Sequence, residues 1–266
     1  MYLVIIMSFI QNLGGITIKF FPKIFESIGR VAIFIYKTFR AIFSKKWYFT
    51  NIAHQFFEIG FCSLPVVAMT AIFTGGVMAL QTYAGCNRFG AESTVPTIVV
   101  LAITRELAPI LVGLMVAGRI STSIAAQIGT MKVSDQIDAL YTLSTSPYKY
   151  LILPRVLAST ISMPLLVLIA DVIGIFGGLM ASVISLKFDM ASYLNNTMNF
   201  LKFGDVCSGL IKSVVFGFII AICGCYHGYN SKGGAEGVGK ATTSAIVSAS
   251  IFILLSNYLM TELFFF

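Results

Sequence analysis

The sequence predicts an all-α integral membrane protein with about five transmembrane helices. Three observations support this class: 57% of the 266 residues are apolar, 11% are charged, and long apolar runs separate the charges. Soluble domains carry about 25% charged residues, and about 20 apolar residues span a bilayer as a helix. The run PLLVLIADVIGIFGGLMASVISL is continuous, whereas the strands of a transmembrane barrel alternate over about ten residues.

Residues 1–50 form the first predicted domain, a basic amphipathic segment at the membrane surface. Between residues 19 and 46, lysine and arginine interleave with phenylalanine and isoleucine at helical spacing. This pattern favours a helix lying on anionic headgroups, and the density of apolar residues argues against a nucleic-acid partner. The start, MYLVIIMSFIQNLGG, has no basic residue before its apolar core and is a poor signal peptide.

Residues 51–266 form the second predicted domain, which crosses the membrane. The five predicted spans are about Phe61–Tyr83, Val95–Val116, Val156–Leu186, Val206–Tyr226 and Ala245–Phe266. The third would be about 46 Å long as a helix, against roughly 30 Å of hydrocarbon. It must therefore tilt, bend near Pro164 or the following glycines, or project into water.

The basic residues predict the orientation. With a cytoplasmic amino terminus, thirteen of the 18 lysines and arginines lie in inside segments, three in outside loops and two within spans. The positive-inside rule therefore places the amino terminus in the cytoplasm and the carboxyl terminus outside.

A short amphipathic segment lies in the polar stretch between the second and third spans. Val133, Ile137 and Leu140 recur at i, i+4 and i+7, with Asp135 and Asp138 on the other face. Such a helix could rest on the bilayer or dock into a groove of a cytoplasmic partner. Acids on the polar face fit an anionic headgroup layer poorly, which favours the protein partner.

Arg105 and Glu106 lie side by side within the second span, in ITRELAPIL. Each ionised side chain at the bilayer centre costs at least about 2.5 kcal/mol. Either each residue bonds a neighbouring helix and holds the bundle together, or the two line a cavity in which Arg105 meets a lipid phosphate. By residue type, the candidate partners are Glu58, Gln81, Asp171 and Lys212.

Three further residues bear on this choice. Pro109 has no N–H, so the carbonyl of Arg105 loses its usual helix donor, as expected where a helix lines a cavity. Lys212 lies about one and a half turns into the fourth span, so its amine either snorkels to the interface or contacts substrate. For Asp171, in the middle of the third span, we expect a bond to a backbone group or to Arg105.

The stretch GAEGVGKA (Gly234–Ala241) nearly spells a phosphate-binding P-loop. However, Ala241 lacks the hydroxyl that would hold magnesium, and the stretch follows a membrane span rather than a strand. We interpret it as a turn, with Thr242 or Thr243 capping the fifth helix. The cysteines and histidines have no ligand spacing, so no metal, cofactor or disulfide framework is predicted, and any ATP is bound by a separate subunit.

The block RELAPILVGLMVAGRISTSIAAQIGTMKVSDQIDAL, followed by PRVLAS, resembles the signature of the MlaE-type permease family. GGVMALQ, LIKSVVFG and KATTSAIV extend the resemblance from about residue 50 to the end. These permeases are membrane subunits of ABC transporters that move phospholipids between the inner and outer membranes and maintain outer-membrane lipid asymmetry. The resemblance implies a multi-pass permease of the bacterial inner membrane that is not itself an enzyme.

The resemblance also implies partners and site residues. The expected partners are a second copy of the chain, an MlaF-like cytoplasmic ATPase with a STAS-domain regulator, an MlaD-like periplasmic hexamer of MCE domains, and phospholipid. A coupling helix matching Gly129–Leu143 would contact the ATPase through Met131, Val133, Asp135, Ile137, Asp138 and Leu140. A lipid pocket between the two copies would be lined by Thr74, Met78, Leu80, Tyr83, Arg105 and Glu106, to which we add Lys212. The family often carries an acid where this chain has Asn257, which weakens any charge pairing through that position.

Two other functions are compatible with the sequence. A proton-coupled secondary transporter of lipids or other amphiphiles could use Glu106 and Asp171 as titrating carboxylates. A membrane-embedded lipid transferase could hold a phosphate with Arg105, but no nucleophile with an adjacent base can be identified. Only the ABC permease accounts for the amphipathic segment, and co-purification of an ATPase would separate it from the secondary transporter.

Overall fold

The computed structural model describes residues 25, 26, 28–42 and 48–265, and its contacts divide the chain into two units, residues 1–46 and 47–266. The described residues of the first unit are helical, and Arg30 pairs with Glu26 one turn earlier at 3.8 Å. The rest of the predicted amphipathic stretch 19–46 lies outside the described residues. Large apolar side chains are exposed on this helix at Phe25, Ile28, Ile33, Tyr36 and Phe39.

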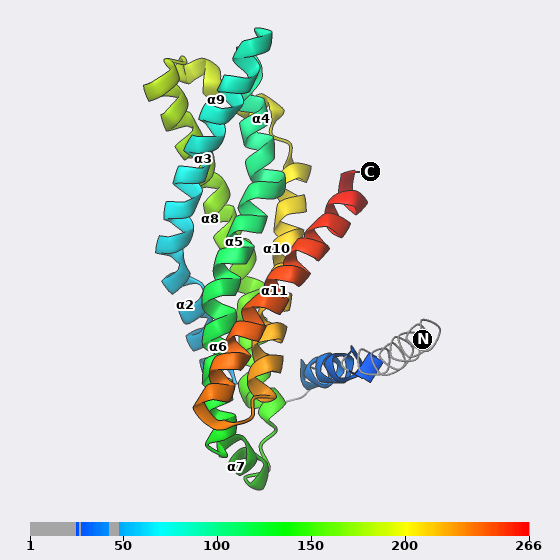
Figure 1. Ribbon diagram of the computed structural model, residues 1–266. Coiled ribbons are helices and arrows are strands. Elements are labelled where there is room, and N and C mark those ends of the chain that lie inside the picture. Colours follow the sequence, from blue (N-terminus) through cyan, green and yellow to red (C-terminus); the bar gives the residue numbers. More distant parts are fainter. Residues whose placement is uncertain (1–24, 27, 43–47, 266) are drawn as a thin grey trace, which may run out of the picture. The chain divides into compact units, whose positions relative to one another are not determined.

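The second unit is a bundle of long helices (Figure 1). Within the described residues, five are long and apolar enough to cross a membrane: Phe49–Phe89, Glu92–Val133, Tyr148–Leu186, Phe203–Tyr229 and Gly234–Phe265. The predicted number and order of spans are confirmed. Each helix is longer than predicted, because it continues through polar residues beyond the point where the apolar run stops.

The first span consists of two α-helices and two 3₁₀ turns. Helix α2 (Phe49–Ile59) leads through Gly60 and the 3₁₀ turn η1 (Phe61–Ser63) into α3 (Leu64–Cys86). Pro65 lies in the first turn of α3, where a missing N–H breaks no helical hydrogen bond. The 3₁₀ turn η2 (Asn87–Phe89) ends the first span, and η3 (Glu92–Thr94) begins the second.

The second span is a helix with two π-helical turns. It runs through α4 (Val95–Ala102), the π-turn η4 (Ile103–Leu107), α5 (Ala108–Val116), the π-turn η5 (Ala117–Ser121) and α6 (Thr122–Val133). The predicted end at Val116 is therefore wrong, because the helix continues through the polar residues that follow.

The predicted coupling helix over Gly129–Leu143 is not one helix. α6 ends at Val133, Asp135 adopts a left-handed conformation (φ 57°), and a separate short helix, α7 (Gln136–Thr142), follows. Aspartate tolerates this conformation better than most residues. Val133 therefore lies on a different helix from Ile137 and Leu140, and the predicted i, i+4, i+7 face does not form.

The third span begins with the π-turn η6 (Tyr148–Ile152) and continues as α8 (Leu153–Leu186), with Pro164 inside it. Its 34 residues make a helix about 51 Å long, so α8 must tilt in, or extend beyond, a hydrocarbon core of roughly 30 Å. A shorter helix, α9 (Met190–Phe200), follows. α7 and α9 lie at opposite ends of the second unit, here named the α7 end and the α9 end (Figure 1).

The last two spans are α10 (Phe203–Tyr229) and α11 (Gly234–Phe265). α11 includes the whole P-loop-like stretch; its first residue, Gly234, and the preceding Gly233 both have positive φ. The hydroxyls of Thr242 and Thr243 donate to the carbonyl of Gly239 inside the helix. The predicted turn and threonine cap are therefore wrong, since the helix starts earlier than its apolar part.

Glycines allow the long helices to pack closely. A Cβ added to Gly75 on α3 would collide with the backbone of Gly174 on α8, and one added to Gly177 on α8 would collide with the backbone of Ile72. Small residues at such contacts are the usual way in which membrane helices gain packing energy. α8 also contacts α10, where the Ser159 hydroxyl donates to the Gly217 carbonyl at 2.8 Å.

Candidate functional site

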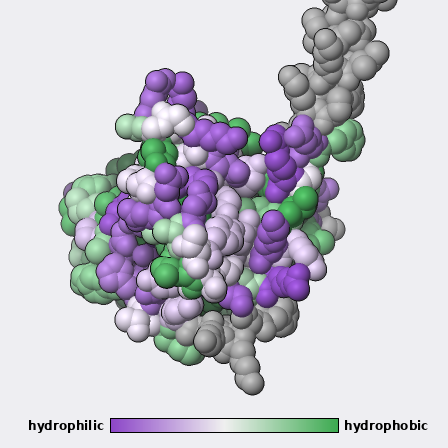
Figure 2. All heavy atoms as spheres, turned by 90° about the horizontal axis from the view of Figure 1, so that it is seen from below, coloured by the Kyte–Doolittle hydropathy of each residue, from purple (hydrophilic) through white to green (hydrophobic). Residues whose placement is uncertain are grey.

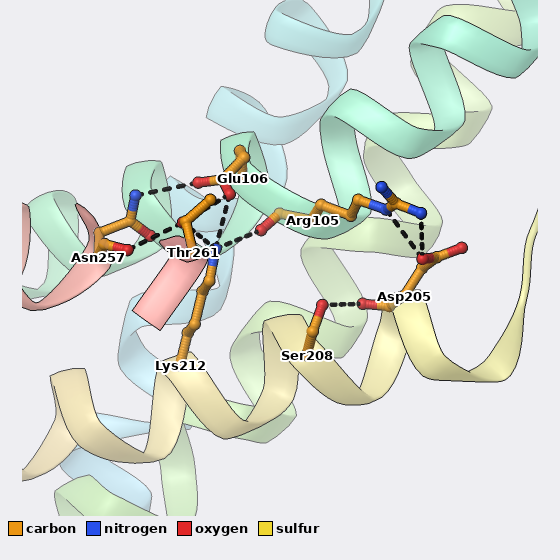
Figure 3. Close-up of polar contacts among 7 residues, drawn as sticks. All are labelled: Arg105, Glu106, Asp205, Ser208, Lys212, Asn257 and Thr261. Carbon is orange, nitrogen blue, oxygen red and sulfur yellow. Dashed lines mark hydrogen bonds and ion pairs between the residues drawn. The ribbon is translucent and has the colours of Figure 1, made fainter. Parts of the chain in front are cut away.

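A polar cluster joins the second, fourth and fifth spans (Figure 3). Its residues come from η4, α10 and α11, which places four charged side chains inside membrane-spanning helices. The two positive and two negative charges balance. The members of the polar cluster are Arg105, Glu106, Asp205, Lys212, Asn257 and Thr261.

Lys212 is the centre of the cluster. Its side chain is 0% exposed, and its Nζ donates to Glu106 Oε1 at 2.7 Å and to Thr261 Oγ1 at 2.8 Å. The third acceptor is the carbonyl of Arg105 at 3.0 Å, the group that Pro109 leaves without a helix donor. The prediction that Pro109 frees this carbonyl is borne out, but snorkelling of Lys212 is wrong, because its amine is turned into the bundle.

Glu106 binds two helices at once. Besides Lys212 on α10, its carboxylate accepts hydrogen bonds from Thr261 Oγ1 at 2.8 Å and from Asn257 Nδ2 at 3.0 Å, both on α11. The amide of Asn257 thus takes part through a hydrogen bond rather than a charge. An acid at this position would add a third negative charge next to Glu106.

Arg105 points away from Glu106, toward the start of α10 (Figure 3). Its Nε and one terminal nitrogen lie 2.8 and 2.7 Å from Asp205 Oδ1, while Asp205 Oδ2 accepts from the backbone N–H of Lys202 and so caps α10. The guanidinium also lies 4.5 Å from the ring centre of Phe265. Because 35% of its side chain is exposed, Arg105 can still reach a phosphate.

Sequence reasoning named Lys212 as a partner for the arginine and glutamate but missed Asp205 and Thr261. Asp205 gave a usable signal, since it is an acid in the first turn of a span. Of the other partners proposed by type, Glu58 instead accepts a hydrogen bond from Gln127 at 3.2 Å.

Asp171 does not have the bond that was predicted for it. It is 4% exposed, and neither carboxylate oxygen has a hydrogen-bond partner within the described part of the chain. Arg105, the expected partner, pairs with Asp205 instead.

An apolar recess lies beside the polar cluster, between α3, the η4–α5 region and α8. The recess is small, and it is bordered by Thr70, Thr74, Gly75, Leu107, Leu111 and Gly174, among other residues. Leu107 immediately follows Glu106, so the recess and the polar cluster share the π-turn η4. The lining offers few polar groups, so its chemistry suits contact with a hydrocarbon chain.

The residues predicted for the lipid pocket fall into separate places. Thr74 borders the recess, and Arg105, Glu106 and Lys212 belong to the polar cluster. Met78 is half-buried one turn beyond Thr74, whereas Leu80 is exposed two residues later, about 200° around α3 from Met78. Tyr83 packs edge-on against Phe188 near the α9 end. Their contact with lipid remains a prediction.

The residues predicted to contact an ATPase lie at the α7 end, which is largely hydrophilic in the view of Figure 2. Val133, Asp135 and Asp138 are exposed, and Met131 and Leu140 are half-buried. Ile137 is fully buried, so its side chain anchors α7 to the bundle rather than facing outward. Lys132 on α6 binds both oxygens of Asp138, at 3.0 and 3.1 Å, and fixes the turn between the two helices.

Replacing Arg105 by lysine is expected to lower the free energy of unfolding by about 1–2 kcal/mol. Lysine keeps the charge but cannot make the two-nitrogen contact with Asp205 or stack on Phe265. Thermal unfolding in detergent measures the change. Arg88→Lys is the control, because Arg88 is exposed in η2, and an equal effect of both substitutions would contradict the prediction.

A family model and several relatives identify the same family of proteins. The family model described as "Permease MlaE" matches residues 52–263. A probable ABC transporter permease protein of Rickettsia felis is 54% identical over 260 residues, covering 98% of this chain and 99% of the relative. A probable ABC transporter permease protein of Synechocystis is 40% identical, covering 81% and 82%. The intermembrane phospholipid transport system permease protein MlaE of Haemophilus influenzae is 31% identical over 264 residues, covering 98% of each chain.

Proposed function

The chain belongs to the MlaE permease family, and we propose that it is the membrane subunit of an ABC transporter that moves phospholipids between the inner and outer membranes. In this role it maintains the lipid asymmetry of the outer membrane. The observation that carries the proposal is the polar cluster beside an apolar recess, inside helices that cross a membrane.

The two features suit the two parts of a phospholipid. The exposed third of the Arg105 side chain can bind a phosphate oxygen, and the apolar lining of the recess, bordered by Thr74 and Leu107, suits contact with an acyl chain. Glu106 is bonded on three sides by α10 and α11, so it shapes the site and keeps those helices next to η4. Transport needs no covalent step in this chain, only two conformations with different affinities for lipid.

ATP is bound and hydrolysed by a separate cytoplasmic ATPase that contacts the segment 129–143. The exposed residues of α7 and the hydrophilic surface at this end support such a docking surface (Figure 2). We place the protein in the inner membrane with the α7 end in the cytoplasm and the carboxyl terminus in the periplasm, the orientation in which the basic residues obey the positive-inside rule. A second copy of the chain and a periplasmic hexamer of MCE domains complete the transporter.

Leu143→Asp is expected to reduce co-purification of the ATPase about tenfold or more, because a charge would replace an exposed apolar residue next to α7. Leu143 is 73% exposed, so the substitution leaves the bundle intact, which Ile137→Asp would not. The measurement is the amount of ATPase that purifies with the tagged chain from detergent. The control is Phe89→Asp. Phe89 is 86% exposed and lies in η2, just after α3, away from α7.

Transport by the reconstituted complex tests the proposed function directly. Lipid movement between labelled donor and acceptor vesicles should require ATP and the bound ATPase. Transport by the chain alone, driven by a proton gradient and insensitive to ATP, would instead identify a secondary transporter. The observation that favours this alternative is the buried carboxylate of Asp171, which lacks a hydrogen-bond partner within the described residues. Intramembrane carboxylates of this kind carry protons in secondary transporters.

A further inference from the structure

Two tyrosines connect α7 to a distant part of the chain. The hydroxyl oxygens of Tyr141, on α7, and Tyr229, the last residue of α10, lie 3.0 Å apart. The ring of Tyr148 at the start of η6 packs against Tyr229, with 5.6 Å between ring centres. We name the hydroxyl pair of Tyr141 and Tyr229 the tyrosine link.

The tyrosine link differs from the other bond described for α7. The ion pair between Lys132 and Asp138 connects α7 to α6, the helix that directly precedes it in the sequence. The tyrosine link instead connects α7 to a membrane span 88 residues away. A displacement of α7 therefore acts directly on α10 through this bond, as well as on α6.

α10 is built to pass such a displacement along its length. Its 27 residues form one unbroken helix, about 40 Å long. Near the tyrosine link, Gly224 and Gly228 press against the backbone of Ser121 and Ala125 on the second span, so close that an added Cβ would lie 2.9 Å from their carbonyl oxygens. Toward the other end, Gly209 packs still more closely on Thr104, where an added Cβ would lie 2.5 Å from the carbonyl oxygen.

The far part of α10 carries two members of the polar cluster. Asp205 holds Arg105, and Lys212 holds Glu106 together with the carbonyl of Arg105. A shift or rotation of α10 therefore changes the bonds that position Arg105 and Glu106. The same helix thus has the tyrosine link at one end and the proposed lipid site at the other.

We propose that the tyrosine link transmits the motion of α7 to the polar cluster through α10, which makes Tyr141 and Tyr229 positioning residues for lipid transport. This inference rests on the proposed function, since it assumes that an ATPase moves α7. The tyrosine link acts by geometry: the hydroxyl pair fixes the end of α10 relative to α7, and no proton needs to move.

The test uses Tyr141→Phe, Tyr229→Phe and the double variant, in the complete transporter reconstituted in vesicles. Each substitution removes one hydroxyl and keeps the ring, so packing is preserved. The measured quantity is the number of lipids moved per ATP hydrolysed. We expect each single variant to lower it about two- to tenfold, the range that corresponds to one hydrogen bond. The double variant should match the single ones, because both remove the same bond.

The control is Tyr258→Phe, since Tyr258 is an exposed tyrosine on α11, and it should leave the ratio unchanged. A merely structural role would lower the melting temperature without changing the ratio of lipid to ATP, and would overturn the inference. The inference would also be overturned if the double variant moved fewer lipids per ATP than either single variant, by the product of the two single effects. The two hydroxyls would then act separately rather than as one bond. Failure of the unaltered complex to couple transport to ATP would overturn the proposed function itself, which keeps the two failures distinct.

Discussion

Replacing Lys212 by methionine is expected to lower the free energy of unfolding by about 3 kcal/mol and to abolish lipid transport. The substitution leaves the carboxylate of Glu106 without its cation, and it leaves the carbonyl of Arg105 without a donor. Both groups lie inside a membrane span, where water cannot take the place of the lost amine. Removing one partner of a buried ion pair costs about 3–5 kcal/mol. We expect the lower value here, because the Glu106 side chain is 32% exposed. Thermal unfolding in detergent and the protein level in membranes measure the effect.

The double variant Lys212→Met with Glu106→Gln separates charge balance from simple loss of packing. Removing both charges leaves no unpaired carboxylate, so most of the lost stability should return while transport stays impaired. Glu106→Gln alone should also lower the stability, because the buried ammonium of Lys212 then lacks its anion and the single amide oxygen cannot accept from both Thr261 and Asn257. Equal stability of the Lys212→Met variant and the unaltered protein would show that the ion pair does not hold the bundle.

Gly75→Ala is expected to prevent the stable packing of α3 on α8, at a cost of about 3 kcal/mol or more. The added methyl group would occupy the space of the Gly174 carbonyl, and a backbone atom cannot move aside as the end of a flexible side chain can. α3 also borders the recess through Thr74, so lipid transport should fall together with the melting temperature.

The neighbouring glycine supplies a matched control. A Cβ added to Gly76 would lie 3.6 Å from Ala181 and from the carbonyl of Gly177, which is ordinary contact. Gly76→Ala should therefore be neutral or slightly stabilising, since alanine favours the helix by up to about 1 kcal/mol. If the two alanine variants melted at the same temperature, close packing at Gly75 would not be what holds the two helices together.

The membrane spans could be predicted from the sequence because a helix that crosses the hydrocarbon core needs about 20 mostly apolar residues, and such runs are visible in the sequence. The freed carbonyl of Arg105 could also be predicted, since proline chemistry is local and needs no knowledge of neighbours. The ends of the helices were harder to predict: Val116 and Ala245 mark the limits of apolar runs, but the helices continue through polar residues that can still form backbone hydrogen bonds.

The partners of the charged residues could not be predicted in the same way. Lys212 sits at a depth from which its amine could reach the interface, and only the position of η4 shows that the amine turns inward instead. Asp171 and Asp205 are equally plausible partners for Arg105 by type. The choice between them depends on which helix lies beside the second span at that depth, which hydrophobic periodicity does not encode.

The two π-turns of the second span change which residues lie on which face of the helix. A π-turn closes its hydrogen bonds over five residues instead of four, so it accommodates one residue more than an α-helical turn. Every side chain beyond it is then displaced by about 100° from where uninterrupted α-helical geometry would put it. After η4 and η5 the offset is about 200°, enough to exchange the inward and outward sides of α6. Deleting one residue from either turn would reorient everything that α6 and α7 present, although the sequence on both sides would be unchanged.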